Sequence, residues 1–106
     1  MAKVKWTKKA DCLFYQYVKE ALWEYGKKTS KKWMDERVEM ADRLSAHPLS
    51  YTPEPLLKGN SKDYRSCTVL RRFKIIHYYA KTSDTVYITD IWDTRMSPET
   101  LRKRIK

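Results

Sequence analysis

The chain has 106 residues, which is enough for one domain with a single core. Apolar residues make up 42% of it and aromatic residues 13%, a composition typical of a folded domain and not of a disordered segment. Lysine and arginine number 23 against 13 aspartate and glutamate residues, so the formal net charge is +10. This excess predicts an anionic partner: nucleic acid, an acidic protein segment or a membrane surface.

Several classes of protein are excluded by what the sequence lacks. No run approaches the roughly 20 apolar residues that cross a bilayer, and residues 1–9 lack the apolar segment of a secretory signal. Cys12, His47, Cys67 and His77 are too widely spaced for a zinc site, and two glycines cannot build a glycine-rich phosphate loop. We therefore expect no metal, no cofactor and no membrane association, and a cytoplasmic protein whose two cysteines are reduced, buried thiols.

The first part of the chain predicts a short strand and a long helix. Residues 3–6 alternate charged and apolar side chains, with Val4 and Trp6 on one face of the strand. Thr7 suits the N-cap of a helix and Gly26 suits its C-terminal end. The apolar residues between them have helical spacing: Ala10, Leu13, Phe14, Tyr17, Val18, Ala21, Leu22 and Tyr25.

A second helix is expected to begin at a cap formed by Thr29 or Ser30 and to end before Pro48. Very few residues separate it from the first helix, so the two should form an antiparallel hairpin. The aromatic residues on both helices are expected to fill the core and not to stack on bases: Tyr15, Tyr17, Trp23, Tyr25 and Trp33.

The second part of the chain predicts three strands and a short helix. Residues 48–63 are irregular, whereas residues 64–70, 73–80 and 85–92 are rich in β-branched and aromatic side chains with short connections between them, which predicts an antiparallel meander. Ser97 and Pro98 suit the start of a C-terminal helix. The expected fold is a single α+β domain, residues 1–106, of order β-α-α-β-β-β-α: a helical hairpin on one face of a twisted antiparallel sheet.

Cations inside the predicted strands are the candidate site residues. In residues 73–79, Phe73 and Ile75 should pack under the helices, which places Lys74 on the open side of the sheet beside Tyr78. By the same alternation His77 points towards the helices and is expected to be a packed histidine and not a general base.

Arg65 in the neighbouring strand meets Lys74 across the ladder if the register allows. Two such cations would repel each other without an anion, and a phosphate would satisfy them and be stabilised by them. The alternative is that both pair with carboxylates of Asp63, Asp90 or Asp93.

The ordered set of motifs resembles the RelE/ParE superfamily of type II toxin–antitoxin toxins, over nearly the whole chain. The motifs are the initial strand ending in Trp6, the end of the second helix at Leu44-Ser45-Ala46-His47-Pro48, then Leu57-Lys58-Gly59, Tyr64-Arg65, Phe73-Lys74-Ile75-Ile76-His77-Tyr78, and Val86-Tyr87-Ile88-Thr89-Asp90-Ile91-Trp92 leading into Asp93-Thr94-Arg95. The resemblance implies the same α+β fold. It also implies a toxin that arrests growth and can serve to stabilise a plasmid. A small acidic antitoxin neutralises such a toxin.

The resemblance implies two mechanisms. The RelE branch cuts mRNA in the ribosomal A site, and the ParE branch blocks DNA gyrase. Arg65, Lys74 and Arg95 match the basic positions of RelE-like nucleases by motif position. Cys67 stands where these nucleases carry a second basic residue, and the catalytic tyrosine of their C-terminal helix has no counterpart, since the last tyrosine here is Tyr87.

The sequence-based hypothesis is therefore a toxin that cleaves mRNA on the ribosome without a metal. Arg65 and Arg95 would stabilise the charge on the phosphorus while the RNA 2′-hydroxyl attacks, and Lys74 would orient the phosphate or assist proton transfer. The residues expected to bind nucleic acid are Lys58, Lys62, Arg71, Arg72 and Lys74. The alternatives are a non-enzymatic inhibitor of gyrase and a plain nucleic-acid-binding domain, and the expected toxin–antitoxin assembly includes a heterotetramer.

Overall fold

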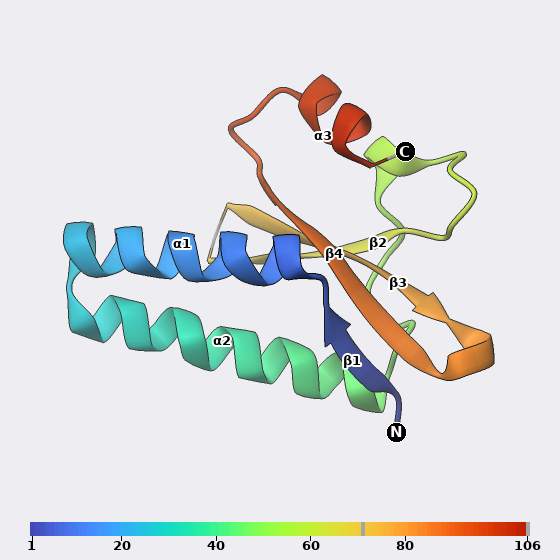
Figure 1. The fold of residues 1–106 in the computed structure, drawn as a ribbon, viewed down its shortest axis with the longest axis horizontal. Helices are drawn as coiled ribbons and strands as arrows, with labels where there is room; N and C mark the ends of the chain where they lie inside the picture. Colours follow the sequence, from blue (N-terminus) through green and yellow to red (C-terminus); the bar gives the residue numbers. More distant parts are fainter. Residues whose placement is uncertain (71, 106) are drawn as a thin grey trace.

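The computed structural model describes residues 1–70 and 72–105. Its elements follow the expected order and confirm the α+β class (Figure 1). They are β1 (Lys3–Trp6), α1 (Lys8–Tyr25), α2 (Lys27–Ala46), the short 3-10 helix η1 (Pro55–Leu57), β2 (Arg65–Val69), β3 (Phe73–Ala80), the 3-10 turn η2 (Lys81–Ser83), β4 (Thr85–Asp93) and α3 (Pro98–Arg104).

The helical hairpin turns at a single residue. Thr7 caps α1 as expected, and its side chain accepts a hydrogen bond from the Ala10 backbone N–H. Gly26 ends α1 and precedes α2, and its φ of 91° and ψ of 178° form a backbone conformation that is essentially restricted to glycine. The prediction that Thr29 or Ser30 caps α2 is wrong, because Gly26 reverses the chain at once and α2 begins at Lys27.

The sheet is mixed, whereas a purely antiparallel sheet was expected. The strand order is β1-β4-β3-β2, with β1 parallel to β4 and the other neighbours antiparallel. The hairpin returns the chain to the start of β1, where the Ala2 N–H donates to the Ser45 carbonyl. The next strand, β2, therefore runs in the same direction as β1. Because β3 is antiparallel to β2 and β4 is antiparallel to β3, β4 is parallel to β1.

A β-bulge changes the register between β3 and β4. The register shifts after Ile76, and the extra residue on β4 is Thr89. Ile88 and Ile91 are consequently three positions apart yet both belong to the core under the helices. The Thr89 hydroxyl donates to the Ile76 carbonyl at 3.3 Å.

The sheet is covered on both faces. The face under α1 and α2 carries the main core, which includes Phe73 and Ile75 as expected; its buried members are Ala2, Ala10, Phe14, Met40, Leu44, Cys67, Phe73, Ile75, Val86, Ile88 and Ile91. The outer face was expected to be open. Instead α3 and η1 cover part of it through a second cluster: Leu57, Ile76, Trp92, Leu101 and Ile105.

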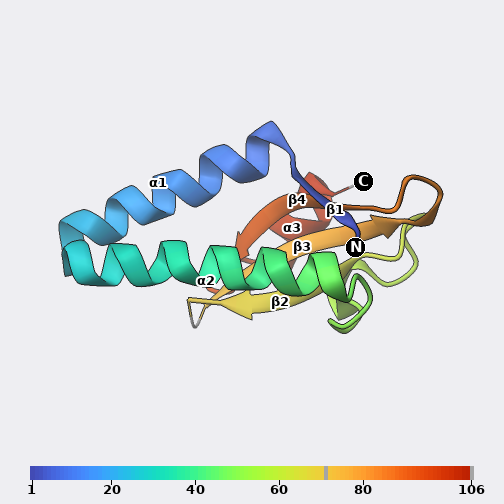
Figure 2. The ribbon, with the colours of Figure 1, turned by 90° about the horizontal axis from the view of Figure 1, so that it is seen from below.

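The free end of the helical hairpin projects beyond the sheet in both views (Figure 2). Tyr17 and Trp33 pack against Phe73, as expected of core residues. Trp23 and Tyr25 were also expected in the core, but their side chains are 82% and 56% exposed. They are exposed because no strand lies beneath this end of α1. Tyr15 is also exposed, and its ring lies beside Arg37 of α2.

Candidate functional site

Lys74 lies on the outer face of β3, as expected, but a buried carboxylate binds it. Its amine lies 3.1 Å from Oε2 of Glu54 and forms a second, shorter bond to Oε1. Glu54 is 1% exposed and also accepts a hydrogen bond from the Ser66 hydroxyl at 3.3 Å. The amine lies 5.6 Å from the ring centre of Trp92 on β4. The charge of Lys74 is therefore already compensated within the protein.

Arg65 lies on the opposite face of the sheet from Lys74. The register pairs Arg65 with His77, and Lys74 with Thr68, so the predicted meeting of Arg65 and Lys74 across the ladder is wrong. The Arg65 guanidinium forms an ion pair with Asp63 at 3.0 Å and donates to the Tyr51 carbonyl at 2.7 Å. The alternative expectation of a carboxylate partner holds for Arg65.

Arg95 and Arg72 share one carboxylate at the end of β4. The Arg95 guanidinium lies 3.0 Å from Asp93, its backbone N–H also donates to that carboxylate, and Arg72 lies 3.7 Å away. Burial alone would raise the pKa of Asp93, but the hydrogen bonds from Arg95 and the charges of Arg95 and Arg72 outweigh it and lower that pKa. The Arg95 side chain nonetheless remains 65% exposed.

The three predicted catalytic residues thus do not converge on one pocket. Lys74 and Arg95 lie towards the same end of the β3–β4 pair, since Lys74 pairs with Trp92 in the register, whereas Arg65 points to the helix side. Each of the three pairs with a different carboxylate.

The remaining predicted nucleic-acid-binding residues occupy two places. Lys58 and Lys62 line an open cavity of about 580 Å³ formed by residues 53–64. The Lys62 amine lies 5.2 Å from the ring centre of Tyr78. Arg72 lies beside Asp93, and Arg71 lies outside the described residues.

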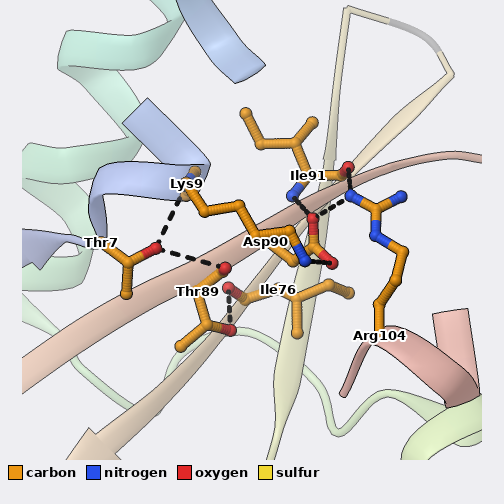
Figure 3. Close-up of polar contacts among 8 residues, drawn as sticks. Thr7, Lys9, Ile76, Thr89, Asp90, Ile91 and Arg104 are labelled. Atoms are coloured by element: carbon orange, nitrogen blue, oxygen red, sulfur yellow. Dashed lines mark hydrogen bonds and ion pairs between the residues drawn. The ribbon is translucent and has the colours of Figure 1, made fainter. Parts of the chain in front are cut away.

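A second buried carboxylate joins three elements (Figure 3). Asp90 on β4 is completely buried and binds Arg104 at the end of α3 and Lys9 at the start of α1, the latter at 3.5 Å. Its Oδ1 also accepts from the Ile91 N–H. Next to it, the Thr7 hydroxyl donates to the Thr89 carbonyl at 3.3 Å, so the cap of α1 is tied to the bulge of β4. This network fixes α3 and α1 to one strand.

His77 is a packed histidine, as expected. It is fully buried, its Nδ1 lies 3.2 Å from the Ile75 carbonyl, and its ring meets the Tyr51 ring edge to face. Burial, aided by the nearby Arg65 charge, lowers the pKa of His77 to about 4, so the ring is neutral at physiological pH.

The two cysteines are free but differ in exposure. Cys67 is buried, and burial raises the pKa of its thiol to about 12, which makes it unreactive. Cys12 is exposed, contrary to expectation, since it lies on the solvent side of α1.

Residues 1–70 and 72–105 contain neither a metal-binding cluster nor a membrane-spanning helix. No group of three or more His, Cys, Asp or Glu side chains in this part of the chain could hold a metal ion. In the same residues, no helix has the length and apolar character needed to span a bilayer.

Sequence reasoning missed Glu54 and assigned the wrong partners to Asp90. Glu54 stands between Pro53 and Pro55 in a stretch that was expected to be irregular, and the one available signal was that Lys74 inside a strand requires a partner. Asp90 was considered as a partner for Arg65 or Lys74, whereas it binds Lys9 and Arg104.

Comparisons with known proteins identify the fold. No family model matches the chain, and no curated protein matches its sequence. A solved chain described as the chromosomal ParDE TA system from P. aeruginosa matches 88% of this chain and 96% of its own length, with a TM-score of 0.68 and 19% identity. A metal-bound toxin from Helicobacter pylori matches 90% of this chain and 97% of its own length, with a TM-score of 0.65 and 21% identity. The chain therefore shares its fold with these two solved structures.

Proposed function

We propose that this protein is the toxin of a type II toxin–antitoxin pair and arrests growth when its antitoxin is absent. The observation that carries this proposal is the likeness of fold to two proteins described as a ParDE system and a toxin, over at least 88% of this chain and at least 96% of the others. Because a fold alone does not determine a function, the proposal needs a direct test.

The proposed partner is a small acidic antitoxin. A net charge of +10 favours an acidic ligand, and a disordered acidic segment can fold over a large surface as it binds. Exposed apolar side chains at the projecting end of α1 add a surface that such a segment can cover: Leu22, Trp23 and Tyr25. The proposed assembly is a toxin–antitoxin complex, with a heterotetramer as its expected form.

For the mechanism, we propose inhibition by binding, as in ParE-type block of DNA gyrase. Two observations support it over cleavage of mRNA. Arg65, Lys74 and Arg95 are each engaged by a carboxylate, and Arg65 lies on the far side of the sheet from Lys74. His77, the histidine nearest to them in the sheet, is buried and neutral and so cannot exchange a proton with a substrate.

Ribosome-dependent mRNA cleavage is the second candidate. It is favoured by Arg72 and Arg95, which share Asp93 at one end of the β3–β4 pair, where a phosphate could compete with Asp93 for the two arginines. In this mechanism Arg95 stabilises the transition-state charge, whereas Lys74 can orient the phosphate only if it leaves Glu54, and Arg65 can contribute only if it leaves Asp63.

The test is to induce the chain without its antitoxin and count colonies, and then to assay the purified protein. Gyrase inhibition yields cleaved DNA–gyrase complexes and intact mRNA. Cleavage yields truncated mRNA from translating ribosomes, and Arg95→Ala abolishes it, whereas Arg102→Ala on the exposed side of α3 serves as the matched control. Unchanged colony counts on induction of the folded protein would refute the toxin proposal.

A further inference from the structure

A row of tyrosines crosses the outer face of the sheet. Tyr78 on β3 pairs in register with Tyr87 on β4, and Tyr87 pairs with Lys5 on β1. Tyr64 precedes β2 and continues the row, with its ring centre 5.6 Å from that of Tyr78 at an interplanar angle of 85°. Tyr78 and Tyr87 are stacked, with ring centres 5.4 Å apart. We call Tyr64, Tyr78 and Tyr87 the tyrosine row.

Tyr78 and Tyr87 lie on the part of the outer face that the second core cluster leaves open. That cluster covers the neighbouring end of this face at Ile76 and Trp92, and Tyr64 packs against its edge. The three tyrosines are only half-buried, and Lys5 is exposed. Alternation along β1 supports this orientation, because Val4 and Trp6 pack in the core under the helices and Lys5 therefore faces outwards.

The charge around the tyrosine row is positive. Lys5 stands at one end of it and the Lys62 amine lies over the Tyr78 ring at 5.2 Å. Lys58 lines the adjoining cavity of about 580 Å³, to which Tyr64 and Lys62 also contribute. Two carboxylates, Glu54 and Asp63, also line this cavity. Both are already paired, because Glu54 binds Lys74 and Asp63 binds Arg65.

We propose that the tyrosine row is a binding site for single-stranded nucleic acid. Unpaired bases stack on the tyrosine rings, and the flanking lysines, Lys5, Lys58 and Lys62, contact the phosphates. Aromatic side chains on an open sheet face, flanked by cations, supply the two interactions that bind single strands: stacking of the bases on the rings and neutralisation of the phosphate charges.

A single strand fits this surface better than a duplex or an acidic peptide does. The rings stand on an open sheet face, where they can stack only on bases that are not already stacked within a helix. An acidic peptide would use the lysines but would gain little from three aromatic rings in a row. The site does not include Arg65, Lys74 or Arg95, although Glu54, the partner of Lys74, lines the adjoining cavity. The inference therefore holds whether the protein blocks gyrase, cuts mRNA or is not a toxin.

The experiment measures fluorescence anisotropy of labelled oligonucleotides with the purified chain. The probes are an oligouridylate and an oligothymidylate of about 12 nucleotides, which is within the site size of known single-strand binders, and a DNA duplex of the same length. We expect both single strands to bind more tightly than the duplex. Tyr78→Leu combined with Tyr87→Leu should weaken single-strand binding by about fivefold or more, because stacked bases are lost.

Matched variants separate stacking from charge and from misfolding. Tyr78→Phe with Tyr87→Phe keeps the rings and should bind as the wild type does, and Tyr15→Leu on α1 removes an exposed tyrosine elsewhere without effect. Lys5→Gln and Lys62→Gln should each reduce the slope of log K against log salt by about 0.7. Titrating the wild type with oligouridylate should also shift the NMR signals of the three tyrosine rings, which needs no variant to fold.

Three results would overturn the proposal. The first is wild-type affinity in the folded leucine variant together with unmoved tyrosine signals. The second is binding of the duplex as tight as that of the single strands. The third is an acidic peptide of glutamates that binds with the same dependence on Tyr78 and Tyr87, which would assign the face to a protein partner.

Discussion

Lys74 and Glu54 form an ion pair in which only the lysine reaches solvent. The Glu54 side chain is fully buried, whereas that of Lys74 is 25% exposed. The carboxylate therefore depends on the amine far more than the amine depends on the carboxylate, because a buried charge without a partner is costly.

Removal of the lysine should cost more stability than removal of the acid. Lys74→Met strands a buried carboxylate and should lower the free energy of unfolding by about 3–5 kcal/mol. Glu54→Gln leaves an amine that can extend into water and should cost about 1–3 kcal/mol. Urea denaturation of the two variants measures the difference.

The double variant serves as the control for this pair. Glu54→Gln with Lys74→Met removes both charges, so it should be more stable than Lys74→Met alone. If Lys74→Met and Glu54→Gln lose the same stability and the losses add, the two side chains do not interact in solution.

His77 should make the protein sensitive to mild acid. Its pKa is about 4 in the folded chain against an ordinary value of 6.5, so between these values the unfolded chain binds the extra proton. The free energy of unfolding should therefore fall as the pH drops from 6.5 to 4, by on the order of 3 kcal/mol, and remain unaffected by this group above 6.5.

His77→Phe removes the titration and keeps an aromatic contact with Tyr51. Thermal melts between pH 4 and 7 should then lose much of their dependence on pH, whereas His47→Gln, at an exposed position, should retain it. An identical pH profile for His77→Phe and the wild type would disprove the assignment.

Asp90 should hold α3 in place. Asp90→Asn keeps the acceptor for the Ile91 N–H but weakens the bonds to Arg104 and Lys9, at a cost of about 1.5–3 kcal/mol. Faster tryptic cleavage within α3 is the expected sign, measured by mass spectrometry. Asp35→Asn, which affects only an exposed pair with Lys31, should leave the cleavage rate unchanged.

Gly26 should be intolerant of any side chain. No atom lies within 4 Å of where a Cβ would stand, so Gly26→Ala costs backbone strain alone, about 1–3 kcal/mol. Ser30→Ala should be nearly neutral, since Ser30 lies inside α2 and not at its cap. The melting temperatures of the two variants measure this difference. A larger loss of stability for Ser30→Ala than for Gly26→Ala would indicate that α2 begins at a cap formed by Ser30, as the sequence predicted.

Local patterns in the sequence predicted most of the elements. The cap at Thr7, the end of α1 at Gly26, the span of β3 and the helix-facing side of Phe73 all follow from side-chain spacing, because each depends on neighbours in the chain. The direction of β1 relative to β4 and the bulge at Thr89 depend on which strands meet, and alternation within one strand carries no such information.

The same limit explains the outcome at the candidate site. Alternation correctly placed Lys74 on the outer face and grouped Arg65 with Cys67, but it could not say that the face of Arg65 is the inner one. That follows from the register of β2 on β3, which pairs Arg65 with His77. Glu54 comes from a segment without periodicity, so its burial against Lys74 had no signature in sequence.

The pairing of β1 with β4 has a consequence for how the protein is made. The first strand emerges from the ribosome long before β4, with which it pairs in the sheet, is synthesised, so a nascent chain carries an unmatched edge until translation is almost complete. Folding of the finished sheet is thereby deferred to the moment of release, and a message that is cut or stalled before residue 85 yields a product that cannot close it.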